Sequence, residues 1–391
     1  MDGIRGRINT NSIMAEEKYY CYICGDEITD KNSTDEHIIL NALGGHLHSY
    51  TVICKDCNTK MGETADAKLA EDLSFFTDFL GVKKNRQHDH NQVMTDDEGH
   101  EIVVDGGGRN LTLRRPYVEN KEKDGVREIK MAVRNKKELD GFLKGMVKRN
   151  ELTQAQADEI LAKAKVTEHH SPLKTRTVIS EEAFPSIIKS AANYYVDQTH
   201  DISTVKALVP YIEGKGDCKD VLYLHHFKTL PYPEIKGQVT HMIHIEGSAK
   251  TGLLYAMMEY YSIYVYMVVI DRNYNGQDIN MTYTYDVVAG QEVDRTFTLS
   301  LTMKELDDFR NQPYDEYVKY LPYVQKRADA VMAVWDEKLL HEELHEVIDK
   351  AFKKFPEGCV MTPDKMAVVQ NDIMEYIEKK IERSFNLKEG K

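Results

Sequence analysis

The chain has 391 residues and a formal net charge of −13, with 41% hydrophobic and 29% charged residues. These proportions are ordinary for a globular protein, and the length predicts two or three domains of roughly 150 residues each. The acidic total argues against a protein that coats nucleic acid non-specifically, and no apolar run approaches the roughly 18–20 residues of a membrane span.

Four of the six cysteines form two CxxC pairs, Cys21 with Cys24 and Cys54 with Cys57, and the other two stand alone. This pattern suits a reducing compartment and one bound metal better than a disulfide framework. Residues 1–17 lack the apolar region of a secretory signal. We therefore expect a cytoplasmic protein in which these first residues form a tail outside the fold.

Residues 18–80 are predicted to form a compact module of two strands and a helix. The pattern predicts strands at Glu36–Leu40 and Thr51–Ile53, a turn at Gly44-Gly45, and helix over Asp56–Leu80. Four thiolates are the ligand set of a closed structural zinc site. The two CxxC pairs are separated by 29 residues, more than the roughly 15–20 of a plain four-cysteine site. The longer spacing predicts that the residues between the two pairs have a function beyond holding zinc.

Residues 81–118 are predicted to be an irregular linker or a hairpin. Short strands are expected at Glu101–Val104 and Asn110–Arg115, on either side of three consecutive glycines. The glycines lack the Lys-Ser/Thr that follows them in a phosphate-binding loop, which favours a plain turn. Residues 105–176 hold 17 Lys and Arg against 11 Asp and Glu. Phosphate contacts by Arg109, Arg114 and Arg115 would suit DNA bound beside the module, and a solvated helical face is the alternative.

Residues 119–391 are predicted to form an α+β region that recognises substrate, oligomerises or regulates. Its first part, 119–200, is predicted to be helical, with helices at Glu151–Lys165 and Glu181–Gln198 and Thr153 as an N-cap. Residues 220–302 are predicted to form an antiparallel sheet, and residues 303–391 are predicted to be helical again. The expected strands are Val221–His226, Val239–Glu246, Tyr261–Asp271 and Asn280–Val288, with Asp294–Thr302 continuing the pattern; the long terminal helices are Asp336–Phe355 and Met366–Phe385.

The stretch from Cys21 to Leu69 joins these signals into one motif. It reads CxxC, then Glu-His-Ile-Ile, then Leu-Gly-Gly, then CxxC-Asn, then Gly and Asp on the helix. The combination resembles the HNH endonucleases, the zinc-stapled branch of the ββα-metal nucleases. The family often has Pro after His-Ile-Ile, where this chain has Leu40. That departure is expected to alter the stiffness of the loop more than its chemistry.

The resemblance implies roles for individual residues. His37 would be the general base that takes a proton from water, as a group with a pKa of about 6.5 can do at neutral pH. Asn58 would hydrogen-bond near His37 and hold the loop. Glu36 and Asp66 would bind a divalent catalytic metal, and carboxylate oxygens favour Mg²⁺ or Mn²⁺. Gly62, between Asn58 and Asp66 on the predicted helix, would let the catalytic strand or a phosphate approach.

The remaining histidine and tyrosine patterns favour ordinary structural roles. His341 and His345 form an HExxH pattern typical of zinc proteases, but they lie in an ordinary amphipathic helix with no third ligand in sight. A solvated loop accounts for His88 and His90. His241 and His244 would face opposite sides of one strand, so a shared metal is not expected there. The tyrosines between Tyr255 and Tyr266 favour a sheet core over a base-stacking surface, and His225-His226 points to no function.

The prediction is therefore a metal-dependent endonuclease that hydrolyses phosphodiester bonds in nucleic acid, with DNA as the expected substrate, structural zinc, and catalytic Mg²⁺ or Mn²⁺. A large region of unknown type beside an HNH module resembles the layout of restriction and anti-phage nucleases. The main alternative is a non-catalytic protein whose zinc ribbon binds nucleic acid or another protein. A remote alternative is a zinc protease at His341 and His345.

Overall fold

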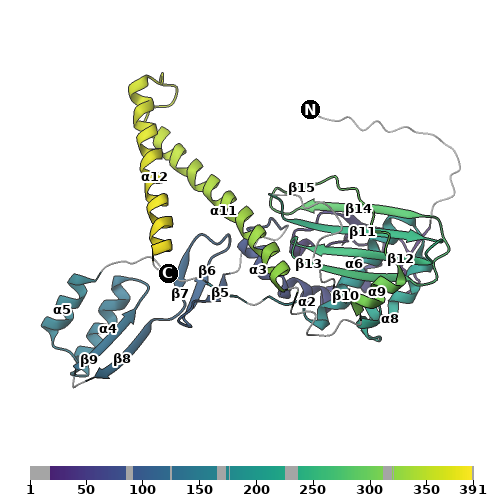
Figure 1. Ribbon diagram of the computed structural model, residues 1–391, viewed down its shortest axis with the longest axis horizontal. Helices are drawn as coiled ribbons and strands as arrows, with labels where there is room; N and C mark the ends of the chain where they lie inside the picture. Colours follow the sequence, from purple (N-terminus) through teal and green to yellow (C-terminus); the bar gives the residue numbers. More distant parts are fainter. Residues whose placement is uncertain are drawn as a thin grey trace.

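The computed structural model describes residues 18–84, 91–123, 126–164, 173–175, 177–224, 237–310, 319 and 321–389. It confirms the predicted α+β class, with short strands and helices first, then a larger antiparallel sheet, and helices at the end (Figure 1). Among these residues, no helix is both long and apolar enough to cross a membrane.

The N-terminal module begins with two short hairpins. Strands β1 (Tyr19–Tyr20) and β2 (Glu27–Ile28) pair around the first CxxC, and β3 (Glu36–His37) pairs with β4 (His48–Ser49). The strand β4 was predicted at Thr51–Ile53, three residues later than its position in the structure. Val52 and Ile53 have buried side chains and lead into the second CxxC, which explains the apolar signal.

The helix predicted over Asp56–Leu80 is three short helices. They are α1 (Lys55–Gly62), α2 (Ala65–Asp72) and α3 (Ser74–Phe79). The break follows Gly62, where Thr64 has φ −125° and ψ −105° and leaves the helical region. The apolar spacing continues across the break because all three helices bury Met61, Leu69 and Phe76 in one core.

A small hairpin unit follows the module. Strands β5 (Gln92–Thr95), β6 (Glu101–Val104) and β7 (Leu111–Leu113) form an antiparallel sheet, as predicted for the second and third of them. The glycine turn between β6 and β7 packs against α11 (Leu321–Phe352): Trp335 Nε1 donates to the Gly107 carbonyl at 3.1 Å. This supports the plain structural interpretation of the three glycines.

Residues 119–132 were predicted to be helical, but they belong to a hairpin that begins at Tyr117. Strands β8 (Tyr117–Lys123) and β9 (Val126–Ala132) pair in antiparallel register. Helices α4 (Lys136–Lys148) and α5 (Gln154–Lys163) follow, and Thr153 caps α5 with a complete capping box, as predicted. The dense charges of the hairpin hid its short alternation of Val, Ile and Tyr.

A six-stranded antiparallel sheet in the order β10-β13-β12-β11-β14-β15 forms the centre of the chain. The strand β12 was missed because both faces of the sheet are covered, so its sequence, LLYAMMEY, does not alternate. The segment 294–302 was expected to continue the strand pattern and forms no strand. The strands are β10 (Leu222–Leu224), β11 (Thr240–Ser248), β12 (Leu253–Tyr260), β13 (Tyr264–Asp271), β14 (Ile279–Asp286) and β15 (Gln291–Glu292).

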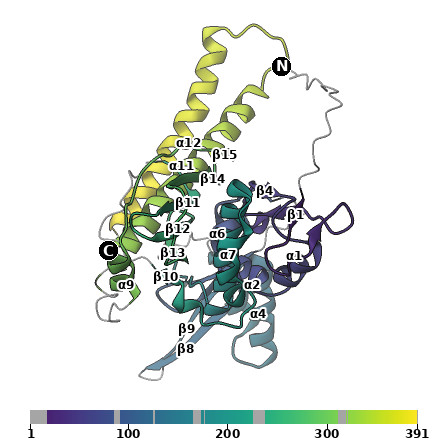
Figure 2. The same ribbon diagram turned by 90° about the vertical axis from the view of Figure 1, so that its right-hand side faces the viewer.

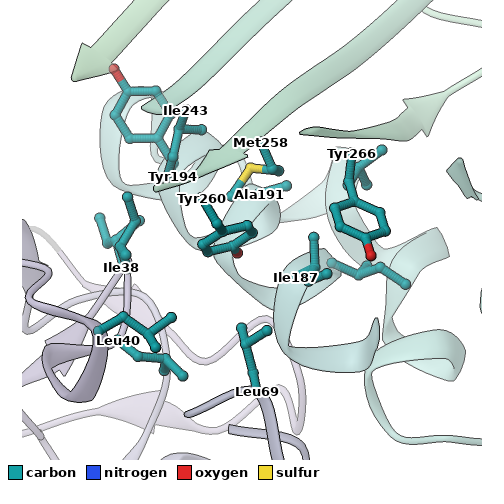
Figure 3. Close-up of a cluster of buried hydrophobic side chains, with 14 of the residues drawn as sticks. Ile38, Leu40, Leu69, Ile187, Ala191, Tyr194, Ile243, Met258, Tyr260 and Tyr266 are labelled. Carbon is teal, nitrogen blue, oxygen red and sulfur yellow. The ribbon is translucent and has the colours of Figure 1, made fainter. Parts of the chain in front are cut away.

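The helix α6 (Phe184–Thr199) lies between this sheet and the N-terminal module (Figure 2). Figure 3 shows Ile38 and Leu69 of the module, Ile187 and Ala191 of α6, and Met258 of β12 in one apolar cluster. The opposite face of the sheet is covered by segment 294–302 and by α9 (Met303–Arg310), through Phe297, Leu299, Leu301 and Leu306.

The remaining helices extend the chain on either side of this core. Two short helices, α7 (Ile202–Val205) and α8 (Val209–Ile212), follow α6. The helices α11 and α12 (Pro363–Glu389) pack against each other as a hairpin that extends away from the sheet (Figure 1). The two terminal helices were predicted, although α11 begins 15 residues earlier than Asp336.

Candidate functional site

Four sulfur atoms meet at the base of the N-terminal module. The Sγ atoms of Cys21, Cys24, Cys54 and Cys57 all lie within 4.8 Å of one another. The Cys24 and Cys54 sulfurs are 3.7 Å apart, close to the roughly 3.8 Å between two ligands of a tetrahedral zinc with Zn–S bonds of about 2.3 Å. No disulfide links them. The donor set therefore fits a closed structural zinc site, and it is the one such group of possible ligands within the described ranges.

Local backbone geometry presents the cysteines. The first pair lies in a knuckle in which the Gly25 amide donates to the Cys21 carbonyl at 2.8 Å, with Gly25 at φ +85°. The second pair is at the start of α1, where Cys54 is the N-cap residue. A metal bound there joins the β1–β2 hairpin to α1 across the 29-residue insertion, which includes β3 and β4.

His37 lies on β3, directly opposite His48 on β4. The two imidazole rings stack with centroids 5.8 Å apart, and His48 Nδ1 lies 2.6 Å from Asp35 Oδ1. The His37 side chain is half-buried, and burial lowers the pKa of its imidazole below the ordinary value although Asp35 acts in the opposite direction. A lowered pKa favours the neutral imidazole, which is the form that accepts a proton.

Asn58 lies on α1 and binds the segment that enters β3. Its Nδ2 donates to Thr34 Oγ1 at 3.0 Å, three residues before His37. One turn earlier, the Lys55 amide donates to the Asn32 carbonyl at 2.7 Å. Both bonds fix the approach of the strand to the start of α1.

Glu36 and Asp66, the predicted ligands of a catalytic metal, are close together and buried. They are bridged by a lysine from α6: Lys189 Nζ lies 2.6 Å from Glu36 Oε1 and 2.7 Å from Asp66 Oδ2. Burial by itself would lower the pKa of Lys189, but the two carboxylates outweigh it and leave that pKa above its ordinary value. A metal held by both carboxylates would have to displace this ammonium group. Metal binding by this pair stays a prediction.

The polar network around these carboxylates was not predicted. Asn193 Nδ2 donates to Glu36 Oε1 at 2.7 Å, Ser186 Oγ donates to Asp66 Oδ1 at 2.5 Å, and the Tyr22 hydroxyl donates to Asn193 Oδ1 at 2.7 Å. Ser186, Lys189 and Asn193 are spaced by three and four residues in a helix that is otherwise largely apolar. This stripe of polar residues was the available sequence signal.

The loop after β3 requires its two glycines. At Gly45 a Cβ would lie 2.0 Å from the Ile39 carbonyl oxygen, and Gly44 has φ +87°. The loop docks on the sheet, where the Leu43 carbonyl accepts from the Tyr261 hydroxyl at 3.1 Å and lies 2.9 Å from His241 Nε2. The imidazole that presents that nitrogen is fully buried, which lowers the pKa of His241 to about 4.

Two of the three predicted phosphate-binding arginines form ion pairs within the chain. Arg109 binds Glu342 and Glu346 of α11, and Arg114 Nη1 lies 3.0 Å from Glu101 Oε1. Arg115 is exposed. Binding of nucleic acid by these arginines stays a prediction, and for the first two it would compete with the acidic partners.

The HExxH pattern lies on the exposed side of α11. His341 and His345 are both exposed, and Glu342, the first of the two glutamates between them, binds Arg109. Within the described part of the chain these histidines belong to no group of three metal ligands, and a zinc protease needs a third ligand.

The remaining histidines and tyrosines follow the structural interpretation where they are described. His241 contacts the N-terminal module and His244 stacks on Phe297 across the sheet, at 4.0 Å between ring centroids, so the two face opposite sides. Tyr255, Tyr260, Tyr261 and Tyr266 are buried in the sheet. His88, His90, His225 and His226 lie outside the described residues.

A cavity of about 620 Å³ opens beside α1 and α2, between Lys60, Lys68, Phe184 and Cys218. No residue of the Glu36-His37 strand lines it. The half-buried His37 therefore lies outside this cavity.

These features define a module with a four-cysteine cluster that fits zinc and a histidine on β3. Residues 21–74 match the family model of HNH endonucleases, so this part of the chain is an HNH endonuclease domain. The match covers Cys21 through Ser74 and ends before the sheet. No curated protein and no solved structure matches the chain.

Proposed function

We propose that the chain is a metal-dependent endonuclease that hydrolyses phosphodiester bonds in nucleic acid, with DNA as the preferred substrate. The observation that carries the proposal is His37, a half-buried imidazole on β3 within the matched domain. His37 acts as the general base: its neutral imidazole takes the proton of the attacking water. Asn58 keeps β3 in place through Thr34.

The metal requirement of the proposal has two parts. Zinc at the four cysteines stabilises the domain and takes no part in the reaction. Mg²⁺ or Mn²⁺, when bound with the substrate, would neutralise charge on the scissile phosphate and on the leaving oxygen. The sequence motif predicts Glu36 and Asp66 as ligands of that ion. Both carboxylates contact Lys189, so a metal bound by the pair would have to displace its ammonium group.

The fold supports a targeting or control function for the rest of the chain. The sheet, α6, α11 and α12 amount to far more protein than the chemistry needs, and the sheet, α6 and α11 share a core with the HNH domain. Restriction or anti-phage defence is the biological use that we propose for such a combination.

The test is cleavage of plasmid and single-stranded DNA, and of RNA, by the zinc-loaded full chain with Mg²⁺ or Mn²⁺. His37→Ala is expected to lower the rate by about 10²–10⁴-fold, the usual contribution of a general base. The matched control is the double variant His341→Ala/His345→Ala, which is expected to cleave like the wild type. Unchanged cleavage by folded His37→Ala would contradict the nuclease proposal. Loss of activity in the control would instead favour a site on α11.

A further inference from the structure

The positive charge between Glu36 and Asp66 is the ammonium group of Lys189. Lys189 is 0% exposed, Glu36 is 2% exposed and Asp66 is 7% exposed. The lysine is in the middle of α6, which packs against the sheet on one side and against α2 on the other. Because its surroundings are close-packed, its ammonium group is fixed in place rather than swung in from the surface.

The carboxylate oxygens that face this position already accept hydrogen bonds. Glu36 Oε1 accepts from Lys189 and Asn193, and the two oxygens of Asp66 accept from Ser186 and Lys189. Mg²⁺ requires nearly octahedral oxygen ligands at about 2.0–2.1 Å and keeps several waters. A buried pair bridged by an ammonium group offers neither the oxygens nor the space. The donor set therefore does not fit a divalent ion between Glu36 and Asp66.

We propose that Lys189 is a positioning residue of the nuclease site, and that its ammonium group takes the place of a divalent metal between Glu36 and Asp66. The inference rests on the proposed function. Glu36 is the neighbour of His37 on β3, and its side chain points to the opposite side of the strand. The lysine thus ties the strand that presents the imidazole to α2 and to α6 at once.

Binding of Mn²⁺ tests whether Glu36 and Asp66 are metal ligands, and the measurement does not depend on nuclease activity. Electron paramagnetic resonance would measure free and bound Mn²⁺ with the zinc-loaded full chain, in the absence of nucleic acid. We expect Glu36→Gln and Asp66→Asn to bind Mn²⁺ within about twofold of the wild type, because neither carboxylate is a ligand. A loss of about tenfold or more in either variant, with zinc content unchanged, would overturn the inference and assign the metal to this pair.

Thermal unfolding tests the buried ion pair. Lys189→Met leaves two buried carboxylates without their cation, and we expect the unfolding midpoint to fall by about 5 °C or more. The triple variant Glu36→Gln/Asp66→Asn/Lys189→Met removes all three charges and is expected to recover most of that loss. The control is Lys144→Met, which breaks an exposed pair with Asp140 and is expected to shift the midpoint by about 1 °C or less. A Lys189→Met variant as stable as the wild type would overturn the proposal.

Kinetics separates positioning from mere stabilisation. Below the unfolding midpoint of each variant, Lys189→Met is expected to lower kcat by about tenfold or more while KM for DNA stays within about twofold. Lys189→Arg keeps the charge and is expected to recover part of kcat. An unchanged kcat for folded Lys189→Met would overturn the positioning role. If the wild type cleaves no substrate, the proposed function fails, and the Mn²⁺ and unfolding measurements still decide where the cation lies.

Discussion

The carboxylate of Glu246 on β11 organises the second face of the sheet. It accepts hydrogen bonds from the Tyr255 hydroxyl and from the backbone amides of Leu299 and Ser300, and it lies 3.0 Å from His244 Nε2. Burial acts to raise the pKa of Glu246, but these partners outweigh it and lower the pKa to about 2. The segment 294–302 therefore crosses the sheet bound to a side chain, which explains why it is not a strand.

Glu246 predicts a pH dependence of stability. Because its folded pKa is depressed, its stabilisation is fully present above the unfolded value of 4.5 and is lost as the pH falls from about 4.5 to about 2. A shift of this size corresponds to about 3 kcal/mol. We expect Glu246→Gln to lower the free energy of unfolding at pH 7 by about 2–3 kcal/mol, and the difference from the wild type to shrink through that window.

The measurement is the difference in the free energy of unfolding between the two proteins at each pH. Acid releases zinc from both proteins equally, so the loss of zinc cancels in this difference. Glu292→Gln is the matched control, because Glu292 is an exposed carboxylate on the neighbouring strand β15. A constant difference between wild type and Glu246→Gln from pH 7 to pH 2 would show that the carboxylate is not stabilised in this way.

The sequence motif identifies the residues of the HNH site but not the residues that contact them in the fold. Cysteine spacing and the Glu-His pair identify the zinc cluster and His37, because these signals lie within about 50 residues and rarely occur together by chance. Lys189 is 153 residues from Glu36. Only the packing of α6 brings the two together, and a lone lysine in a helix is usually a surface residue.

At the scale of elements, helix periodicity predicted one helix where the chain forms three. Amphipathic spacing depends on which residues are buried, and α1, α2 and α3 bury theirs in the same core despite the break at Thr64. The strand β12 was missed for the opposite reason, since burial of both faces removes the alternation that marks a strand. Thr153 was predicted correctly because a cap depends only on local sequence.

The two glycines near the proposed site make different demands on the backbone. Gly45→Ala is expected to disrupt the loop after β3, since its Cβ would lie 2.0 Å from the Ile39 carbonyl, and overpacking of this kind costs about 1–3 kcal/mol or more. Gly62→Ala meets no atom within 4 Å. It lies at the end of α1 and is expected to leave stability unchanged or to raise it by up to about 1 kcal/mol.

Thermal unfolding and zinc content of the two variants provide the measurement. Gly62→Ala serves as the control for Gly45→Ala, because it adds the same methyl group to the same domain. Equal midpoints would mean that the loop adjusts to a Cβ at position 45. If folded Gly62→Ala raises KM for DNA, the nucleic acid passes close to α1, as the predicted role of Gly62 requires.

At the scale of the whole molecule, the HNH domain is not an independent unit. Its side chains Ile38 and Leu69 share a core with Ile187 of α6 and with Met258 of the sheet (Figure 3). The helix α11 adds a further connection, since Trp335 packs on Phe79 with ring centroids 4.5 Å apart. A change at the zinc cluster is therefore expected to alter the stability of the sheet.

Removal of zinc provides the test of that coupling. Chelation, or the Cys54→Ser variant, is expected to destabilise the sheet together with the HNH domain, because structural zinc supplies folding free energy to a unit whose core they share. Hydrogen exchange measures this directly: peptides from β11, β12 and β13 are expected to exchange faster in the zinc-free protein. Cys359→Ser, outside the cluster, is the control and is expected to keep both its zinc and its protection. Unchanged protection of the sheet after zinc loss would mean that the HNH domain folds independently, and that α6 holds its place without the module.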